Sequence, residues 1–228
     1  MHLSEELEQE IRQLGNWRVL IRPLDLHPSR LSSLQSCEEA VEKAAVSLRG
    51  WSYPYHNGQS MDRGANFVEG LVRSTVSLEH WRMYQSGQFA SILSLREDRW
   101  PNIRPMTGLE TVNTLYSLTE FYEFASRLAE QGIFPEGLSI SIDLRNVENR
   151  RLFSGDFTRQ LYREYVCTAR NLPHPTLELT EVEILGKAHD FAINHTLWIF
   201  ERFNWSGSDL SQFLRQEQDK FLRGTFRS

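Results

Sequence analysis

The chain has 228 residues and a net charge of −5, with 40 % hydrophobic and 24 % charged residues. This length fits one large domain, or at most two small ones, and can bury a core without a disulfide or a metal. The acidic balance excludes a general nucleic-acid coat, which would be strongly basic. The two cysteines, Cys37 and Cys167, lie far apart and form no zinc pattern or disulfide framework. With an acidic, amphipathic start unlike a signal peptide and no long apolar run, we expect a soluble, cytoplasmic protein.

The first half of the chain alternates helix-forming and strand-forming stretches. Apolar residues recur at helical spacing after Ser4, and Gly15 supplies the stop. Ser36 and Glu39 form a capping box for a second helix. The expected elements are a helix over 3–14, a strand over 17–24, a helix over 36–48, a turn at Asn57-Gly58, a strand over 67–78 bent at Gly70, a short helical piece over 81–84, a strand over 88–95 and a polar loop over 96–105.

The second half carries the clearest helix and the clearest strand. Thr107 and Glu110 form a capping box before a wide apolar arc that ends at Gly132, which is typical of a central core helix. Residues 138–144 alternate strictly between apolar and polar side chains. The expected elements are this helix and strand, a second strand over 176–185, and closing helices over 188–203 and 209–222.

This order of elements lacks the regular alternation of strand and helix that builds a doubly wound sheet. It predicts a single α+β domain over 1–228, with a mostly antiparallel mixed sheet, packed helices and a C-terminal helical pair.

Two blocks between Leu48 and Phe89 concentrate aromatic and hydrogen-bonding side chains. Ligand pockets combine apolar walls with a few converging polar groups, and these blocks supply both. In the alternative interpretation, the aromatic rings close the core and the arginines lie over them. The predicted ligand- or partner-binding residues are Arg49, Trp51, Tyr53, His56, Trp81, Arg82, Gln85 and Gln88.

The wording of these blocks, Leu48-Arg49-Gly50-Trp51-Ser52-Tyr53-Pro54 and Trp81-Arg82-Met83-Tyr84-Gln85-Ser86-Gly87-Gln88-Phe89, resembles a poorly characterised bacterial family. The endings Phe200-Glu201-Arg202-Phe203-Asn204-Trp205 and Phe221-Leu222-Arg223-Gly224 fit the same family. Its members occur alone or beside Schlafen-like AlbA-type nucleic-acid-binding domains. Members usually continue the first block as Tyr-Pro-His, whereas here Tyr55 takes that place and His56 follows it. The resemblance implies a prokaryotic accessory or sensing module, with antiviral defence or regulation as its setting, and no reaction type.

An arginine-rich stretch over 145–170 supports an alternative, nucleic-acid-binding function. It holds six arginines against three acids, with aromatic residues between them. Cations on phosphates and aromatic rings on bases are the chemistry that single strands require. The competing interpretation is an amphipathic segment with its aromatics in the core. The residues predicted for this alternative are Arg145, Arg150, Arg151, Arg159 and Arg163.

Catalytic patterns are weak in this sequence. It contains no GxSxG elbow and no P-loop motif, and His189 and His195 are six residues apart, too far round a helix to share a face. A hydrolase or nuclease built from Asp143, His189 and the acids of 178–183 is the least favoured hypothesis. We therefore predict a non-enzymatic binding, sensing or accessory module for a protein partner or small ligand, with no cofactor, no metal and no assigned catalytic residue. A homo-oligomer stays open.

Overall fold

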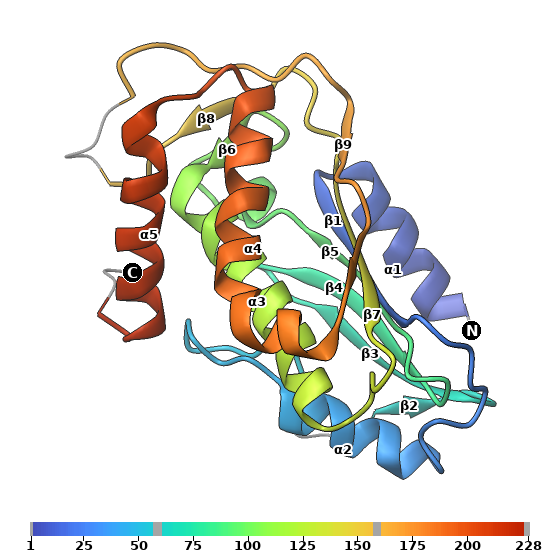
Figure 1. Ribbon diagram of the computed structural model, residues 1–228. Helices are drawn as coiled ribbons and strands as arrows, with labels where there is room; N and C mark the ends of the chain where they lie inside the picture. The colour runs from blue at the N-terminus through green and yellow to red at the C-terminus, as the bar shows by residue number, and fades with distance from the viewer. Residues whose placement is uncertain (1, 57–60, 157–160, 226–228) are drawn as a thin grey trace.

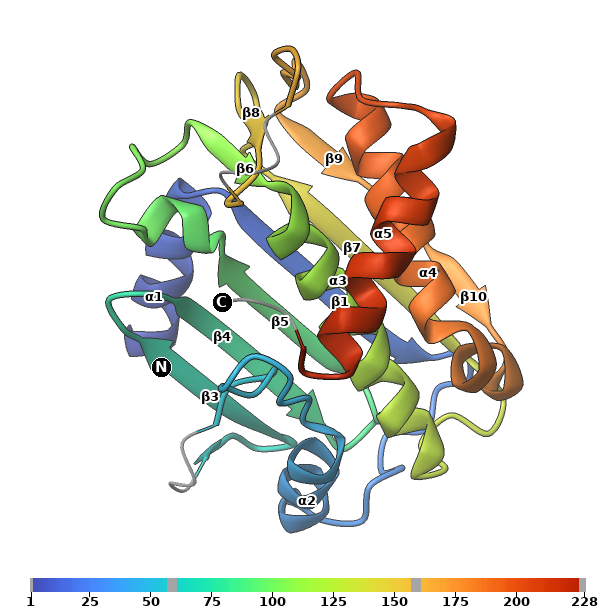
Figure 2. The same ribbon diagram turned by 90° about the vertical axis from the view of Figure 1, so that its left-hand side faces the viewer.

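A mostly antiparallel sheet forms the centre of the fold, and helices cover both of its faces (Figures 1 and 2). The computed structural model describes residues 2–56, 61–156 and 161–225. Within these residues the sheet has eight strands, in the order β10 (Leu177–Leu179), β7 (Leu138–Arg145), β1 (Asn16–Pro23), β5 (Phe89–Ser94), β4 (Leu78–Tyr84), β3 (Phe67–Arg73) and β2 (Asp62–Arg63), with β9 (Asn171–Pro173) also paired to β7. Two short strands, β6 (Gly108–Glu110) and β8 (Arg151–Phe153), pair in parallel beside it.

The helices divide between the two faces of the sheet. The inner face carries the main core and is covered by α2 (Leu34–Ala44), α3 (Thr111–Glu130), α4 (Glu181–Arg202) and α5 (Ser208–Leu222). The outer face is covered in part by α1 (His2–Gln13), which packs on β3, β4 and β5. The predicted α+β domain with a C-terminal helical pair is confirmed. Among the described residues, no helix combines the length and the apolar character needed to cross a bilayer.

Alternation along the central strands decides which side chains meet. In β1, Trp17, Val19 and Ile21 are buried against the helices, while Arg18 lies on the outer face. The same period in β7 buries Ile140, Ile142 and Leu144, as the sequence predicts.

On the outer face, a smaller hydrophobic core and a cluster of one histidine and two glutamates lie under α1. Leu7 and Ile11 of α1 pack on Leu78 and Ile92 of the sheet. Beside them, each ring nitrogen of the buried His80 lies 2.9 Å from a carboxylate oxygen, one of Glu8 and the other of Glu69. Burial on this face as well as on the inner one removes the alternation from the first half of β4, where residues 78–81 are all buried.

The helical piece expected over 81–84 is therefore wrong, because these residues belong to β4. The strand expected over 176–185 is also wrong beyond Leu179. Thr180 and Glu183 form a complete capping box that begins α4 at Glu181, and Val182 is 79 % exposed.

Two helix starts and one strand end differ from the prediction as well. Ser33, not Ser36, caps α2 by accepting a hydrogen bond from the Ser36 backbone, at 3.0 Å. Glu110 caps α3, so the helix begins only at Thr111. Strand β3 ends at Arg73 and a turn leads to β4, while Asn57 and Gly58 lie outside the described residues.

The stretch expected to be a polar loop over 96–105 begins with a 3-10 turn, η1 (Arg96–Arg99), that carries two buried acids, Glu97 and Asp98. Asp98 forms a bidentate ion pair with Arg150, with nitrogen–oxygen distances of 2.8 and 2.6 Å. The two side chains are 1 % and 0 % exposed, respectively. Arginine makes such forked contacts with carboxylates when both groups are held in one plane.

Four backbone groups are hydrogen-bonded to this ion pair. The carboxylate of Asp98 also accepts hydrogen bonds from the backbone of Gly15, at 2.8 Å, and of Met106, at 2.7 Å. Arg150 donates to the Gly108 carbonyl at 2.8 Å and to the Asn146 carbonyl at 3.0 Å. Gly15 must be glycine here, because a Cβ atom would lie 2.2 Å from the Arg150 guanidinium.

Replacing Arg150 with methionine should lower the free energy of unfolding by about 3–5 kcal/mol, because the carboxylate of Asp98 stays buried without its cation. Chemical denaturation followed by circular dichroism measures the loss. The control is Arg151→Met, which breaks an exposed pair with Glu164 and should cost less than about 1 kcal/mol. Equal losses in the two variants would contradict the structural role of the buried pair.

Candidate functional site

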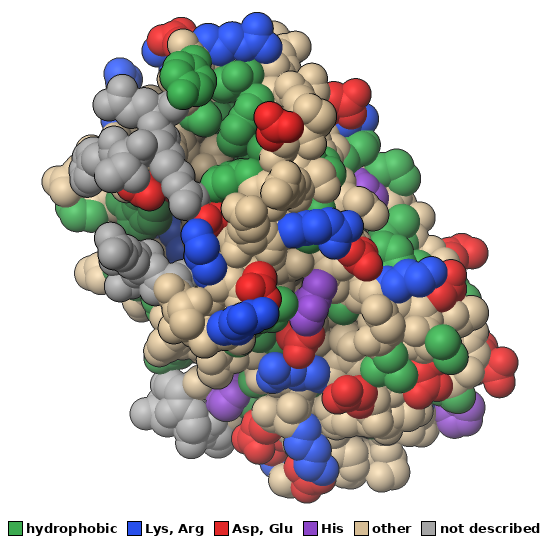
Figure 3. Space-filling model, turned by 60° about the vertical axis from the view of Figure 1, so that its left-hand side comes forward, with side chains coloured by type: hydrophobic (Ala, Val, Ile, Leu, Met, Phe, Trp, Pro, Cys, Tyr) green, Lys and Arg blue, Asp and Glu red, His purple; other side chains and the backbone are tan. Residues whose placement is uncertain are grey.

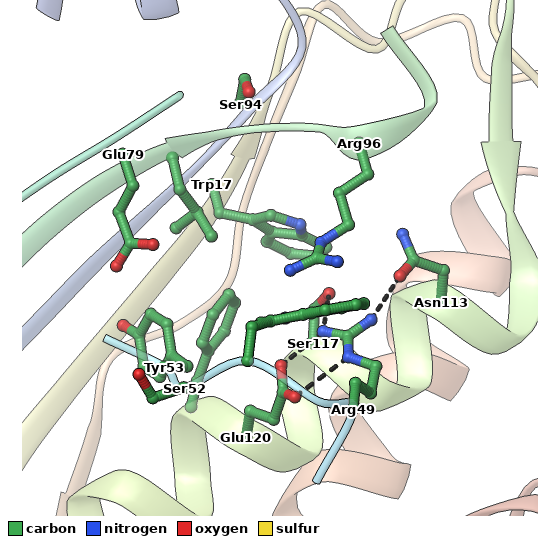
Figure 4. Close-up of a pocket in the computed structure, with 13 residues that line it drawn as sticks. Trp17, Arg49, Ser52, Tyr53, Glu79, Ser94, Arg96, Asn113, Ser117 and Glu120 are labelled. Carbon is green, nitrogen blue, oxygen red and sulfur yellow. Dashed lines mark hydrogen bonds and ion pairs between the residues drawn. The ribbon is translucent and has the colours of Figure 1, made fainter. Parts of the chain in front are cut away.

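A small pocket lies between the inner face of the sheet, the start of α3 and the loop that follows α2 (Figure 4). Its cavity volume is about 20 Å3, enough for a water molecule or one small ligand group. The lining residues are Trp17, Arg49, Trp51, Ser52, Tyr53, Glu79, Leu93, Ser94, Arg96, Asn113, Ser117, Glu120 and Phe121. The structure thus brings three of the predicted binding residues, Arg49, Trp51 and Tyr53, to one place.

The loop after α2 presents these three residues. It is closed by two backbone hydrogen bonds between Val46 and Tyr53, of 2.9 and 2.8 Å. Gly50 at its tip has a φ of 81°, a conformation that favours glycine, and it places Arg49 and Trp51 on either side of the turn. Tyr53 anchors the end of the loop, because its hydroxyl lies 2.9 Å from the Ser91 hydroxyl in the core.

Arg49 is fully engaged by α3. Its guanidinium pairs in bidentate fashion with Glu120, with one nitrogen–oxygen distance of 3.0 Å. It also donates to the Asn113 side-chain oxygen and, at 3.4 Å, to the Ser117 hydroxyl. Figure 4 shows this network on one side of the pocket. Arg49 and Glu120 therefore cancel each other's charge and form a fixed wall.

Arg96 is the opposite case. It projects into the pocket from the start of η1 (Figure 4), and its guanidinium carbon lies 3.6 Å from the ring centre of Trp51. The guanidinium of Arg49 lies 5.3 Å from the same ring, so the indole contacts two cations. Within the part of the chain that the structure describes, the side chain of Arg96 forms no hydrogen bond and no ion pair. Burial, with a smaller contribution from the charge of Arg49, lowers the pKa of Arg96 to about 9, so it stays cationic at neutral pH.

Glu79 is the acid that faces this pocket from the sheet. It is 4 % exposed, and its carboxylate accepts a hydrogen bond from the Tyr55 backbone at 3.1 Å. No cation of the described residues lies within ion-pair distance of it. Burial therefore raises the pKa of Glu79 to about 7, although the hydrogen bond from Tyr55 and the charge of Arg96 oppose the shift.

The second predicted block lies outside the pocket. Trp81 is a core residue that stacks on Phe89, and its indole donates to the Tyr55 carbonyl at 2.9 Å. Arg82 points to the outer face, where it pairs with Glu69 at 2.8 Å. The two blocks are thus in contact through Trp81 and Tyr55, but this contact is part of the core and not of the pocket.

The remaining predicted binding residues support loops. The Gln85 side chain donates to the Leu31 carbonyl at 3.3 Å, and the backbone oxygen of Gln88 accepts from Tyr84 at 2.9 Å. His56 follows the pocket loop, and its buried Nδ1 atom has no hydrogen-bond partner among the residues described. None of the three lines the pocket.

The described arginines predicted for nucleic-acid binding have partners within the fold. Arg150 is wholly buried against Asp98, so its assignment to a nucleic-acid surface is wrong. Arg145 pairs with Asp143 and Arg151 with Glu164, while Arg163 lies over the ring of Tyr165; Arg159 is outside the described residues. On the face drawn in Figure 3, basic side chains are interspersed with acidic ones.

The residues of the hydrolase hypothesis are separated by the fold. Asp143 lies on the outer face of β7 and pairs with Arg145 at 2.6 Å. His189 lies on α4, on the other side of the sheet, and contacts Glu123 at 3.0 Å. Glu183 caps α4. In the described part of the chain, no three histidines, cysteines or acids are placed to hold a metal ion.

Sequence patterns do not reveal Arg96, Glu79, Asn113 and Glu120 as pocket residues. Asn113 and Glu120 lie seven residues apart on α3, a spacing that places both on one face of the helix. This spacing is the sequence feature that could have identified Asn113 and Glu120 as neighbours. Arg96 and Glu79 are brought to the pocket by the pairing of β4 with β5, a long-range feature without a local motif.

Comparison with known proteins gives no match: neither a protein-family model, nor a curated protein, nor a solved structure is similar to this chain. The chemistry of the pocket is therefore the basis on which a function can be proposed.

The buried carboxyl groups of Glu79 and Glu110 should stabilise the fold less as the pH rises from about 5 to 7. Burial raises the pKa values of Glu79 and Glu110 from 4.5 to about 7, so the folded state holds protons in this range that the unfolded chain releases. Each group contributes up to about 3 kcal/mol, present below the unfolded pKa and lost as the pH passes the folded one. Denaturation at pH 5 and pH 7 measures how the free energy of unfolding changes with pH, and this change should be more favourable at pH 7 in Glu79→Gln and in Glu110→Gln than in the wild type. A change equal to that of the wild type in both variants would contradict this assignment.

Proposed function

We propose that this protein is a non-enzymatic binding module that receives an anionic group of a ligand or protein partner in the Arg96 pocket. The supporting observation is the state of Arg96 itself: a cation stacked on Trp51, facing a cavity, without an acceptor among the described residues. Arg96 is half-buried, and an incoming oxyanion could accept charge-assisted hydrogen bonds from its guanidinium, which no acceptor of the described chain now takes.

The other lining groups favour recognition over catalysis. Arg49, Asn113, Ser117 and Glu120 are bonded to one another, which fixes the wall against which a ligand would rest. Trp51 adds an indole N–H that is buried and lacks a hydrogen-bond partner within the described chain. Donors held in place before the ligand arrives lower the ordering cost of binding.

The size of the cavity limits what enters it. A volume of about 20 Å3 admits a small ion or the terminal group of a larger molecule, whose remainder would lie outside the pocket. A module of this kind would act as a sensing or accessory component, the setting that the resemblance to a bacterial family also suggests. Both cysteines are buried free thiols, which agrees with the proposal that it works in the reducing cytoplasm.

The test is a titration of the protein with sodium acetate and with sodium phosphate at constant low ionic strength and pH 6. Calorimetry measures affinity, and the indole N–H signal of Trp51, assigned with Trp51→Phe, reports the location by NMR. Arg96→Met should weaken anion binding about 10- to 100-fold, because it removes charge-assisted hydrogen bonds.

Arg99→Met is the matched control, since Arg99 lies in the same turn but donates to the Ser74 carbonyl, outside the pocket. It should bind like the wild type. Wild-type protein that binds neither anion, or an Arg96→Met variant with undiminished affinity, would overturn the proposal.

A further inference from the structure

Arg49 and Glu120 form an ion pair, and two other charged groups in the pocket have no ion-pair partner among the described residues. They are Arg96, which has no bound acceptor, and Glu79, whose one described hydrogen bond comes from the Tyr55 backbone. The two groups face the same cavity but lie beyond ion-pair distance of each other. Each is thus compensated only weakly by the other across the cavity.

We infer that the occupant of this pocket is a carboxylate monoanion and that it enters together with one proton, which Glu79 takes up. This inference rests on the proposed function, because it names the ligand class of the same site. Charge balance carries it: when the anion compensates Arg96, an ionised Glu79 would become an excess negative charge in a buried space. A proton from the solvent that binds the Glu79 carboxylate removes this excess.

Protonation also changes what Glu79 can do for the ligand. An ionised carboxylate only accepts hydrogen bonds and repels a second carboxylate, whereas the protonated form has an O–H that can donate. Two carboxyl groups that share one buried site commonly hold one proton between them for this reason. Burial has already raised the pKa of Glu79 to about 7, so protonation near neutral pH requires little further free energy.

The charged groups around Glu79 disfavour a dianion. The titratable and charged side chains that face it from the neighbouring elements are Arg49 and Tyr53 of the loop after α2, Arg96 of η1 and Glu120 of α3. Only Arg96 among them is a cation without a bound acid, since Arg49 is paired with Glu120. One available cation and a cavity of about 20 Å3 suit a planar carboxylate better than a phosphate carrying two charges.

The experiment compares acetate, N-acetylglycine and inorganic phosphate at pH 6, 7 and 8, in wild-type protein and in Glu79→Gln. Acetate affinity of the wild type should fall above pH 7, towards a limit of about tenfold per pH unit. Glu79→Gln carries a neutral donor at every pH, so its affinity should not change with pH. Calorimetry in two buffers of different ionisation enthalpy should show proton uptake that approaches one per bound acetate at pH 8.

The control is Glu110→Gln, which removes a second buried acid with a pKa of about 7 that does not line the pocket. Its acetate affinity should keep the wild-type pH dependence. N-acetylglycine that binds more tightly than acetate would identify the source as a peptide chain end, and equal affinities would identify a small carboxylate.

Binding of acetate without proton uptake, or pH dependence that persists in Glu79→Gln, would overturn the inference while leaving the proposed function standing. Phosphate that binds more tightly than acetate at pH 8 would also overturn it. The proton-uptake measurement uses only wild-type protein, so it decides the question even if Glu79→Gln does not fold. Failure of every anion to bind would instead reject the proposed function itself.

Discussion

The ion pair between Asp98 and Arg150 is the interaction on which the rest of this architecture depends. It joins the turn before β1, the start of β6, the loop after β7 and the 3-10 turn after β5 at one buried point. A buried ion pair adds little net stability by comparison with apolar packing, but losing one partner leaves a desolvated charge. The ion pair therefore fixes the position of the 3-10 turn. A movement of this turn would expose the carboxylate of Asp98 or leave it without its cation.

That constraint determines the geometry of the pocket through three consecutive residues. Asp98 fixes the turn, Glu97 accepts hydrogen bonds from the Glu110 backbone and the Asn113 side chain, and Arg96 is directed into the cavity. Asn113 in turn accepts from Arg49, so the 3-10 turn is linked to both cations that contact Trp51. The pocket wall is part of the network that holds the fold together, so its geometry does not depend on a bound ligand.

Much of the fold could be predicted from local periodicity, and the failures have a common cause. Strands β1 and β7 have one apolar face, so Trp17 and Ile140 mark the buried side in the sequence. In β4, α1 buries His80 on the outer face while Trp81 is buried in the main core, so the first half of the strand shows no alternation. The 96–105 stretch is rich in charged residues and therefore looks like an exposed loop. Its acids Glu97 and Asp98 are nevertheless buried, because Asn113 and Arg150, which are not adjacent in sequence, donate hydrogen bonds to them.

The same limit explains the candidate site. Aromatic and arginine density located the loop that carries Arg49 and Trp51, because one loop supplies both. The density of aromatic residues and arginines could not separate these two residues from Trp81 and Arg82. Neighbouring residues of a strand point to opposite faces, so Trp81 and Arg82 are adjacent in sequence but lie on different sides of the sheet. The feature that distinguishes the pocket is the imbalance between a paired arginine and an unpaired one. Both are arginines beside one indole, and only the positions of Glu120 and Glu79 make Arg49 structural and leave Arg96 available to a ligand.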